Sequence, residues 1–483
     1  MTLGLIGIAV SLILLIVLAY RGHSVLVVAP VAALVAALFS GAPLLGTYTQ
    51  IFMPALAGFL STFFPLFLTG AILGKLMTDS GYAEDLASWI SDRLGPKHAL
   101  LVTVLSTALL TYGGISAWVI VFTMFPVATF LFRQADIPRR LMPAAIALGI
   151  FTFATAALPG SPQIHNAIPT RFFGTNTFAA PGLALVCAVI VFGLGMWWLA
   201  VRQRQLAAAG ESYTDLTEIE RRDADAGRPS SSDAVTPLTA DDSRATRRVS
   251  TAQGLIGLLP ILVVVGVNAL LTYVVIPAMD TAYLSEEKYG GVTVEQVASI
   301  WSVAVAMLAA IVVIFLLRPR RARTYVEGLS QGAKNSVLPV FTTASEVAYG
   351  AVIAALAAFA LIRDGIFDVS DNPIVTTALS TAGIAGVTGS ASGGLTISLN
   401  TFGEQLLSQA NALGIDPEVL HRVAAMASIS FDSMPHNGAI ITLLLVTGLT
   451  HRESYKDIFV VTVLVPLVGL VAAVGLGMAF GSF

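Results

Sequence analysis

The residues that could do chemistry are concentrated in a polar interruption of an apolar segment, residues 157–175. Three prolines and two glycines fall in it, together with the side chains of Ser161, Gln163, His165 and Asn166. Proline removes a backbone donor and clashes with the preceding turn, so a helix here must break or unwind. In hydrocarbon, unwound backbone is tolerated only where it is buried in protein or lines a wet cavity. The stretch is therefore a candidate binding site.

A second interruption contains the run Phe431-Asp432-Ser433-Met434-Pro435-His436-Asn437-Gly438. Its His436-Asn437 pair matches His165-Asn166 at an offset of 271 in the numbering, and each pair lies close to a proline. Two further polar stretches, 111–116 and 388–396, contain Gly113-Gly114 and Gly393-Gly394 at an offset of 280. Two matched pairs in the same order indicate an internal duplication. The other four histidines fall at the ends of apolar segments: His23, His98, His421 and His451.

These four polar stretches suit a small organic anion. Hairpin tips and helix breaks expose backbone N–H groups with partial positive charge, and glycine lets a ligand approach the backbone closely. No lysine or arginine is expected in the middle of an apolar segment, so backbone dipoles, hydroxyls, amides and histidine would hold a carboxylate. The predicted substrate-binding residues are Thr111, Tyr112, Gly113, Gly114, Ser116, Gly160, Ser161, Gln163, His165, Asn166, Ser390, Ser392, Gly393, Gly394, Thr396, Ser433, His436 and Asn437. The alternatives are helix packing for the glycine pairs and a satisfied core position for the histidines.

Two carboxyl groups fall inside apolar segments, Glu346 and Asp432. An acid in the membrane is costly unless it is paired, bound to a cation or protonated, and burial in general favours the protonated form. Histidine also exchanges protons near neutral pH. We therefore predict proton coupling through Glu346, Asp432, His165 and His436. A sodium site made of hydroxyl, amide and carbonyl oxygens is the alternative, and Glu346 could instead cap a helix or pair with Lys334.

Composition fixes the class of protein. Apolar residues make up 56% of the chain, and its mean hydropathy is +0.82. Charged residues make up only 11%, against roughly a quarter in soluble proteins. Long uncharged runs recur that approach or exceed the roughly 20 residues needed to cross a bilayer. The sequence predicts an all-α polytopic membrane protein, with residues 1–20 a retained helix rather than a signal peptide. Cys187 is the single cysteine, so we expect no disulfide, thiol–metal site or cofactor. The charges lie in loops, and no nucleic-acid partner is expected.

The segment 202–252 divides the chain. It holds 8 arginines and 9 acidic residues among Gly, Ser, Thr and Pro, so it is expected to be a cytoplasmic hydrophilic linker. The N-terminal half, 1–201, is predicted to contain an extra helix and a first repeat with a hairpin at 98–132 and a broken helix at 141–175. The C-terminal half, 253–483, is predicted to match it with an extra helix, a hairpin at 374–410 and a broken helix at 421–449. Further spans are expected near 2–20, 24–39, 55–76, 181–201, 253–277, 296–317, 336–362 and 457–480, with an interfacial helix in 77–97.

Loop charges set the expected orientation, because cytoplasmic loops carry an excess of lysine and arginine. The loop 318–334 is basic and the loop 278–295 is acidic, so the first is expected inside and the second outside. The linker and the arginines of 133–140 are also inside only if 98–132 is a re-entrant hairpin that enters from the cytoplasm. The hairpin 374–410 then enters from the outside. The second half therefore repeats the first upside down, as an inverted-topology repeat of the kind common in secondary transporters.

Several motifs resemble one known family. They are Gly70-x-x-Leu73-Gly74-Lys75-Leu76-Met77-x-Asp79-Ser80-Gly81, Leu94-Gly95-Pro96-Lys97, Leu110-Thr111-Tyr112-Gly113-Gly114, Leu158-Pro159-Gly160-Ser161-Pro162-Gln163 and Pro435-His436-Asn437-Gly438. This set is similar to the gluconate permease (gluconate:proton symporter) family of the ion transporter superfamily, over nearly the whole chain except 202–252. The resemblance implies a bacterial inner (cytoplasmic) membrane importer of gluconate, related sugar acids or short hydroxy acids such as 3-hydroxybutyrate. It also implies a homodimer with an elevator-like movement.

The sequence as a whole favours a proton-coupled symporter for a small hydroxycarboxylate, with sodium-coupled carboxylate symport as the alternative. An intramembrane hydrolase would need a nucleophile and a base, and Ser433 near His436 could imitate such a pair. A duplicated His-Asn pair has no role in an enzyme with one active centre, so we expect no enzyme. A channel would need a continuous polar stripe, and the apolar flanks of each interruption do not provide one.

Overall fold

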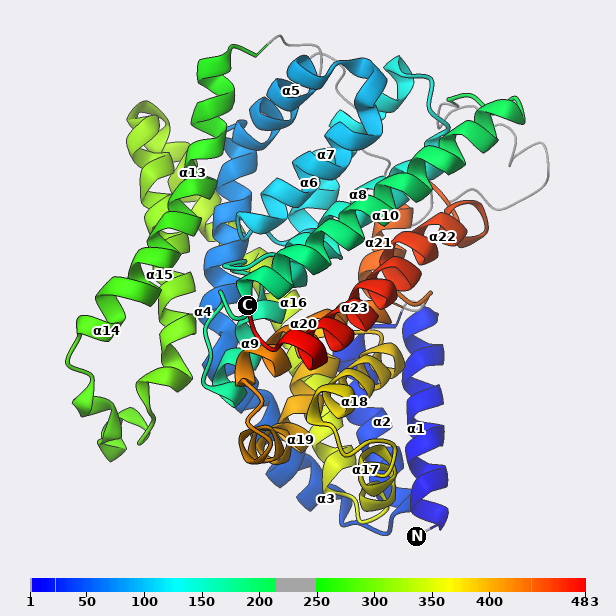
Figure 1. Cartoon of the computed structure of the whole chain (residues 1–483), viewed down its shortest axis with the longest axis vertical. Helices are drawn as coiled ribbons and strands as arrows, with labels where there is room; N and C mark the ends of the chain where they lie inside the picture. Colours follow the sequence, from blue (N-terminus) through cyan, green and yellow to red (C-terminus); the bar gives the residue numbers. More distant parts are fainter. Residues whose placement is uncertain (1, 22, 214–248, 436) are drawn as a thin grey trace.

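The computed structural model describes residues 2–21, 23–213, 249–435 and 437–483. The elements of these residues are helices (Figure 1). In the first half they are α1 (Thr2–Tyr20), α2 (Val25–Phe39), α3 (Leu44–Thr47), α4 (Met53–Asp79), α5 (Tyr82–Leu94), α6 (Ala99–Tyr112), α7 (Ala117–Gln134), α8 (Met142–Ile150), α9 (Ile164–Phe173) and α10 (Pro181–Ala208). In the second half they are α13 (Thr251–Leu270), α14 (Ile276–Ala278), α15 (Val294–Leu317), α16 (Ala322–Ala355), α17 (Phe359–Phe367), α18 (Pro373–Thr388), α19 (Ala391–Ala412), α20 (Pro417–Ser430), α21 (Gly438–Thr447), α22 (His451–Phe459) and α23 (Val465–Phe480).

Seven helices of the described residues are long and apolar enough to cross a membrane. They are 44–79, 139–157, 181–208, 251–278, 294–317, 319–355 and 451–480. Several of these are continuous only because π-helical turns join shorter pieces, at 48–52, 153–157, 271–275 and 460–464. The prediction of a polytopic helical membrane protein is confirmed.

Both predicted hairpins and both predicted breaks are present as local structure. Helices α6 and α7 flank residues 113–116, and α18 and α19 flank residues 389–390. The first broken helix consists of α8, a π-helical turn and α9, separated by 158–163. The second consists of α20 and α21, separated by 431–437. Whether the hairpins are re-entrant in a bilayer stays a prediction.

Several helix boundaries of the two halves recur at an offset of 274 in the numbering. Helix α6 begins at Ala99 and α18 at Pro373, and α7 begins at Ala117 and α19 at Ala391. Helix α9 (Ile164–Phe173) corresponds at both ends to α21 (Gly438–Thr447). Each of these two helices ends at a left-handed glycine, Gly174 or Gly448. The offsets of 271 and 280 read from the sequence therefore differ from this structural offset, and the inverted duplication of the two halves stays a prediction.

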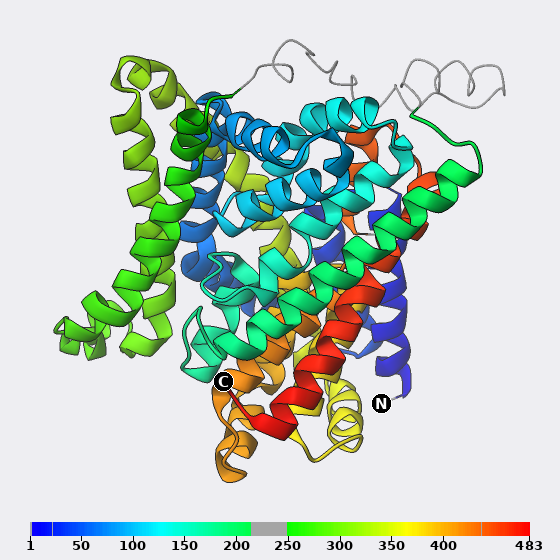
Figure 2. The same ribbon diagram turned by 45° about the horizontal axis from the view of Figure 1, so that its top comes forward.

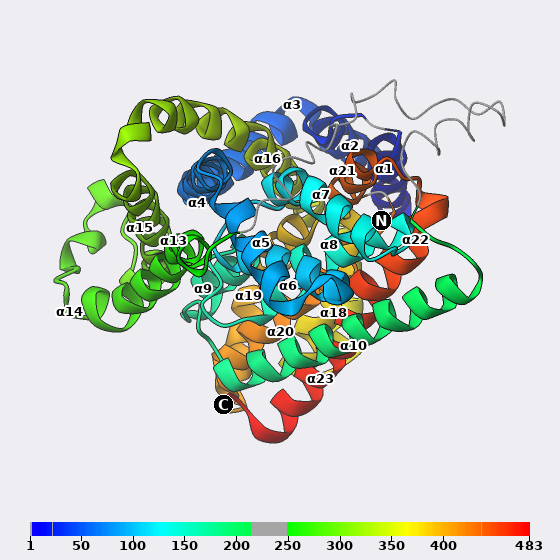
Figure 3. The same ribbon diagram turned by 90° about the horizontal axis from the view of Figure 1, so that it is seen from above.

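The hairpin regions of the two halves lie toward opposite ends of the molecule. Figure 1 shows α5, α6 and α7 in the upper half and α17, α18 and α19 in the lower half. The repeats also interlock, because α7 packs on α21 and α19 packs on α9. Helices α10 and α23 lie side by side across one face (Figure 2). From above, the arm of α13, α14 and α15 and the pair α1 and α2 lie on different sides of the molecule (Figure 3).

One boundary prediction needs correction. Helix α16 begins at Ala322 rather than near 336, so Arg323 and Lys334 lie on a helix and not in a loop. Its first turns form a helix because Glu327, Gln331 and Lys334 are exposed while Tyr325 and Gly328 face the core. Helix α5 is amphipathic as predicted. Its Tyr82 and Leu86 are buried, and Gly254 and Gly257 of α13 allow close contact with it.

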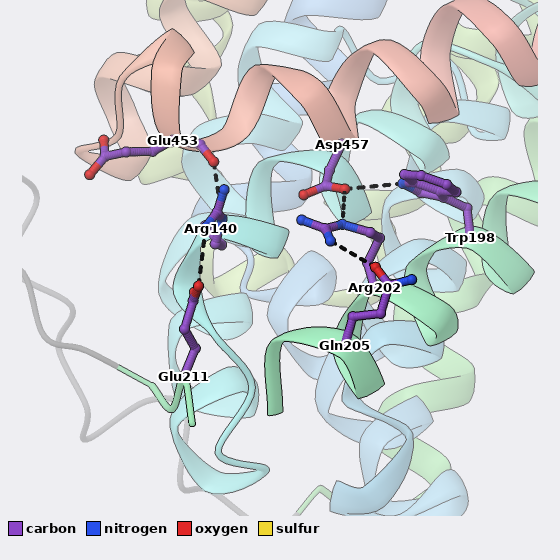
Figure 4. A network of polar contacts seen from close by, with 7 residues as sticks. All are labelled: Arg140, Trp198, Arg202, Gln205, Glu211, Glu453 and Asp457. Atoms are coloured by element: carbon purple, nitrogen blue, oxygen red, sulfur yellow. Dashed lines mark hydrogen bonds and ion pairs between the residues drawn. The ribbon is translucent and has the colours of Figure 1, made fainter. Parts of the chain in front are cut away.

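A polar network fastens the upper end of α10 to α22 (Figure 4). The buried Asp457 carboxylate accepts hydrogen bonds from Trp198 Nε1 at 3.1 Å and from Arg202 Nε at 2.8 Å. Arg140, which precedes α8, donates to the Glu453 carbonyl at 3.1 Å and to Glu211 Oε1 at 3.3 Å. The C-terminal end of α10, which includes residues 202–208 of the predicted linker, is thus held to the second half of the chain by charge-assisted bonds, of which the Arg202–Asp457 pair is largely buried. Most of the linker, 214–248, lies outside the described residues.

The inverted orientation predicts opposite accessibility for the outer ends of the two hairpins. Gln134 at the end of α7 and Ala412 at the end of α19 are both exposed. We expect a membrane-impermeant maleimide to label Ala412→Cys in intact cells, and to label Gln134→Cys only after permeabilisation. Protein with Cys187 alone is the control, because that thiol is buried. Labelling of both cysteines from the same face would contradict the inverted repeat.

Candidate functional site

Asp432 caps the second hairpin. It lies in the break between α20 and α21, and its Oδ1 accepts hydrogen bonds from the Ala391 backbone N–H at 2.7 Å and from Asn437 Nδ2 at 2.9 Å. Asn437 in turn caps α21, with Oδ1 accepting from the Ala439 and Ile440 N–H groups. A carboxylate is favoured at the N-terminus of a helix. The position that the sequence suggested for a bound anion at α19 is therefore occupied by a carboxylate of the protein itself.

Glu346 of α16 faces this cap. Its side chain is buried, and its carboxyl group interacts with the Ser390 hydroxyl and with Asp432. In the described part of the chain, neither Glu346 nor Asp432 forms an ion pair with lysine or arginine. The alternative in which Glu346 pairs with Lys334 does not occur among the described residues. Two buried acids that form no ion pair with lysine or arginine among the described residues thus meet at the tip of the second hairpin.

Gly393 and Gly394 have different roles. A Cβ at Gly393 would lie 2.9 Å from Glu346 Oε2, so glycine leaves room for that carboxyl group. A Cβ at Gly394 would lie 2.3 Å from Ala385 Cα, so this glycine lets α18 and α19 pack closely. The packing alternative is therefore correct for Gly394, while Gly393 belongs to the polar cluster.

Hydrogen bonds join the first hairpin tip, residues 113–116, to the first break, residues 158–163. Gln163 Nε2 donates to the Thr111 carbonyl at 2.7 Å and to the Ile115 carbonyl at 3.3 Å, and Tyr112 Oη donates to the Pro159 carbonyl at 2.8 Å. Gly114 has φ +84°, and a Cβ there would lie 2.7 Å from Met307 Cε of α15. The side chains of Gln163 and Tyr112 are thus engaged by the protein's own backbone.

The structural offset identifies the counterparts in the two halves. It relates Asn437 to Gln163 and Gly389 to Ile115. Gln163 donates to the Ile115 carbonyl, and Asn437 Nδ2 donates to the Gly389 carbonyl at 3.0 Å. Each break therefore uses one side-chain amide to hold the hairpin tip beside it. This matched bond replaces the His-Asn match on which the sequence argument depended.

Asn166 belongs to a separate buried network that the sequence reading missed. Arg422 of α20 is wholly buried and donates to the carbonyls of Ala156 and Ala179 at 2.7 Å and to Asn166 Oδ1 at 3.1 Å. His421 is also buried and lies 3.2 Å from Asn166 Oδ1 through its Nε2. Asn166 Nδ2 donates to the Ser161 carbonyl at 3.0 Å. The expectation that no arginine falls inside an apolar segment is therefore wrong.

A signal for Arg422 was present in the sequence. Asp416 followed by Pro417 is a typical helix start, with an acidic cap and proline in the first turn. The structure has Asp416 Oδ1 accepting from the Glu418 N–H at 2.9 Å. Reading α20 from Pro417 rather than 421 would have placed His421 and Arg422 inside the helix.

The remaining predicted residues lie at or next to the two hairpin tips and the two breaks. Ser161 Oγ donates to the Ala154 carbonyl, and Gly160 has φ +73° in the break. His165 Nδ1 and Ser433 Oγ are buried and have no partner among the described residues. Ser392 lies in the first turn of α19. Gly113 lies at the first tip and Ser116 caps α7 without a side-chain bond. His436 lies outside the described residues.

A cavity of about 480 Å³ lies between α4, α9, α16 and α19. Thr396 is the predicted site residue among the described residues that line it. Thr396 is one helical turn beyond Ser392, to whose carbonyl its hydroxyl donates at 2.8 Å. The cavity therefore lies next to the second hairpin rather than between the Asn166 and Asn437 networks.

Comparisons with known proteins give the class. The family model for GntP family permeases matches residues 1–215. The uncharacterized transporter YxjC of Bacillus subtilis is 41% identical over 467 residues, which cover 95% of this chain and 96% of that protein. An uncharacterized transporter of Haemophilus influenzae is 29% identical over 155 residues, 32% of this chain and 34% of that protein. The solved structure of the Alcanivorax borkumensis YdaH transporter aligns with a TM-score of 0.47 and 17% identity, covering 88% of this chain and 87% of that one.

The Bacillus subtilis match extends along nearly the whole of both chains, and both the relative and the matched family are transporters rather than enzymes. The many apolar helices agree with a multi-pass membrane protein. The chain belongs to the GntP permease family.

Proposed function

We propose that this protein is a proton-coupled symporter that imports a small hydroxycarboxylate, such as gluconate or 3-hydroxybutyrate, across the bacterial inner membrane. The observation that carries the proposal is the pair of buried acids, Glu346 and Asp432, at the tip of the second hairpin. Membership of a permease family supports an organic anion as the substrate.

Within this pair, Glu346 is the better proton carrier. Asp432 accepts two hydrogen bonds from N–H donors, and such bonds favour the ionised carboxylate. Glu346 faces that negative charge from a buried position, so binding a proton removes a like-charge repulsion. Asp432 would then keep the hairpin capped while Glu346 gains and loses the proton.

Substrate recognition is proposed to use the groups around the same tip. Ser390, Ser392 and Ser433 offer hydroxyl groups, and a hydroxycarboxylate offers both donors and acceptors to match them. An elevator-like movement and a homodimer are further parts of the proposal. The interlocking of α7 with α21 and of α9 with α19 favours movement of both hairpins as one body.

Sodium-coupled symport is the second candidate. Carboxylate, hydroxyl and carbonyl oxygens of Glu346, Ser390 and Asp432 are chemically suitable for a hard cation. A bound sodium ion would neutralise the two acids as a proton does, so the two candidates are separated by the driving ion.

Purified protein in liposomes tests the proposed function directly. We expect labelled gluconate or 3-hydroxybutyrate to accumulate when the outside is more acidic than the inside, in buffers without sodium. Addition of a protonophore at fixed membrane potential should abolish the accumulation. Uptake that requires sodium and ignores the protonophore would establish the sodium-coupled alternative instead.

Substitution of the proposed proton carrier should uncouple transport. Glu346→Gln keeps the size of the side chain and removes its exchangeable proton. We expect this variant to lose accumulation driven by a pH gradient but to keep exchange of labelled for unlabelled acid. Glu327→Gln, which changes an exposed acid on the same helix, is the matched control and should behave as wild type. Gradient-driven accumulation by Glu346→Gln would exclude this residue as the carrier.

Removal of the hairpin cap should cost stability. Asp432→Asn replaces the charge-assisted bond to the Ala391 N–H with a neutral one, and a hydrogen bond to a charged group is worth about 1.5–3 kcal/mol. We expect the free energy of unfolding in detergent micelles, measured by denaturant titration, to fall by an amount near the lower end of this range. Ser433→Ala, which removes a buried hydroxyl that has no partner among the described residues, is the control and should change the free energy little. Equal stability of Asp432→Asn and wild type would mean that Asp432 is already protonated in the folded protein.

A further inference from the structure

The cavity between α4, α9, α16 and α19 has the size and lining of a small-molecule site. Its volume of about 480 Å³ falls within the usual range for ligand pockets. The walls combine apolar side chains with a group of polar ones: Ser61, Thr62, Arg171, Thr396, Asn400 and Thr401. Among its described lining residues, Arg171 is the charged one, and none is acidic.

Contacts within the protein occupy only part of the hydrogen-bonding capacity of the Arg171 guanidinium. Its Nη1 donates to Thr62 Oγ1 at 3.1 Å, across the gap between α9 and α4. In the described part of the chain, it forms no ion pair with a carboxylate. A guanidinium has five N–H donors in a planar fork that matches a carboxylate. Donors therefore remain for a ligand in the cavity.

Arg171 is not required by the fold of its helix. A cation in the last turn of a helix is mildly stabilising, which could by itself explain this residue. The equivalent helix of the second repeat, α21, ends at the same kind of left-handed glycine but has Leu445 at the position that corresponds to Arg171. The same helix end is thus made without a cation in α21, while in α9 the cation lines a cavity.

The cavity adjoins the buried acids. Val347 and Gly350 in its wall follow Glu346 on α16, and Thr396 lies one turn from Ser392 on α19. Its α4 residues, 55–63, belong to the part of that helix nearer α3, toward the lower end in Figure 1. This is the end where α17 and α14 lie, opposite the end of α10 that leads into the linker. By the charge bias of the loops it is the outer end.

We propose that this cavity is an outer vestibule in which Arg171 binds the carboxylate of the incoming substrate before the substrate reaches the hairpin tip beside Glu346. The inference rests on the proposed uptake of a hydroxycarboxylate and adds the site that first recognises its charge. Asn400 offers its side-chain amide to the substrate's hydroxyl groups, whereas the Thr62 hydroxyl is engaged by the Gly58 carbonyl and by Arg171.

Uptake kinetics of labelled gluconate in proteoliposomes test the role of the charge. We expect Arg171→Gln to raise KM about tenfold with Vmax nearly unchanged. A loss of affinity of about tenfold is typical when one hydrogen bond to a charged partner is removed at a hydrated site. Arg171→Lys keeps the positive charge but loses the planar, two-pronged guanidinium, so its KM should lie between those of wild type and Arg171→Gln. High salt should raise the KM of wild type more than that of Arg171→Gln, because salt screens the attraction.

Two control variants separate charge from structure. Arg363→Gln removes an exposed arginine of α17, at the same end of the molecule and outside the cavity lining, and should leave KM unchanged. Thr62→Val removes the bond between α9 and α4 but keeps the guanidinium, and should also leave KM nearly unchanged. An unchanged KM for Arg171→Gln would overturn the proposal. An equally raised KM for Thr62→Val would also overturn the proposal, because Arg171 would then act only by joining α9 to α4 through its hydrogen bond to Thr62.

Thiol labelling tests the vestibule without transport. Asn400→Cys places a thiol in the cavity wall, and Arg171 should make a negatively charged methanethiosulfonate reagent react faster than a positively charged one. Arg171→Gln should remove this preference, and gluconate should slow labelling only when Arg171 is present. If gluconate is not transported but still protects the thiol, the proposed function fails while the vestibule stands. If gluconate is transported, but the thiol shows no preference for the negatively charged reagent and no protection by gluconate, the vestibule proposal fails while the proposed function stands.

Discussion

A helix that ends inside a membrane protein must find hydrogen-bond partners for its last turns within the protein, and both broken helices depend on this constraint. The solution is the same in the two repeats. An amide side chain at the start of the second half-helix, Gln163 or Asn437, holds the carbonyl groups of the neighbouring hairpin tip. Break and tip are therefore one unit in each repeat. The polar residues that first attract notice as ligand groups serve the backbone before they serve any substrate.

The two repeats share a scaffold but differ in charge. At the structural offset between the halves, Asp432 and Glu346 correspond to Leu158 and Ile72. Arg422, which closes the first break from α20, corresponds to Leu148. The two halves can thus share a backbone arrangement while their charged side chains differ. A substrate with no two-fold symmetry needs such a difference, and the buried acids are the place where the second repeat departs most from the first.

Much of the architecture could be predicted from the sequence because it depends on apolar length and on proline and glycine. Hairpins 98–132 and 374–410 and the breaks near 158–163 and 431–437 follow from those features alone. The register of the repeat could not be predicted, because short matches such as Gly113-Gly114 with Gly393-Gly394 have different structural causes. The first pair lies at a hairpin tip, whereas Gly393 leaves room for Glu346 and Gly394 lets α18 and α19 pack closely. Arg422 was missed because hydropathy places helix ends poorly where a buried charge satisfies backbone carbonyls. The cavity beside Arg171 depends on four helices at once, which no local pattern reveals.

The capping of α19 by Asp432 gives a physical reason for cation coupling on the proposed function. Two unit negative charges about 5 Å apart repel by about 3 kcal/mol at an effective dielectric constant of about 20, which weakens binding by about a hundredfold. An anionic substrate that approaches the tip would meet this repulsion from Asp432, and again from Glu346 if that acid were ionised. A proton on Glu346 removes the second repulsion and lets that carboxyl group donate a hydrogen bond to the substrate. On the proposed function, the proton therefore arrives with the anion because an ionised Glu346 beside the carboxylate cap would repel the substrate, and a neutral side chain in place of Glu346 would lose this coupling.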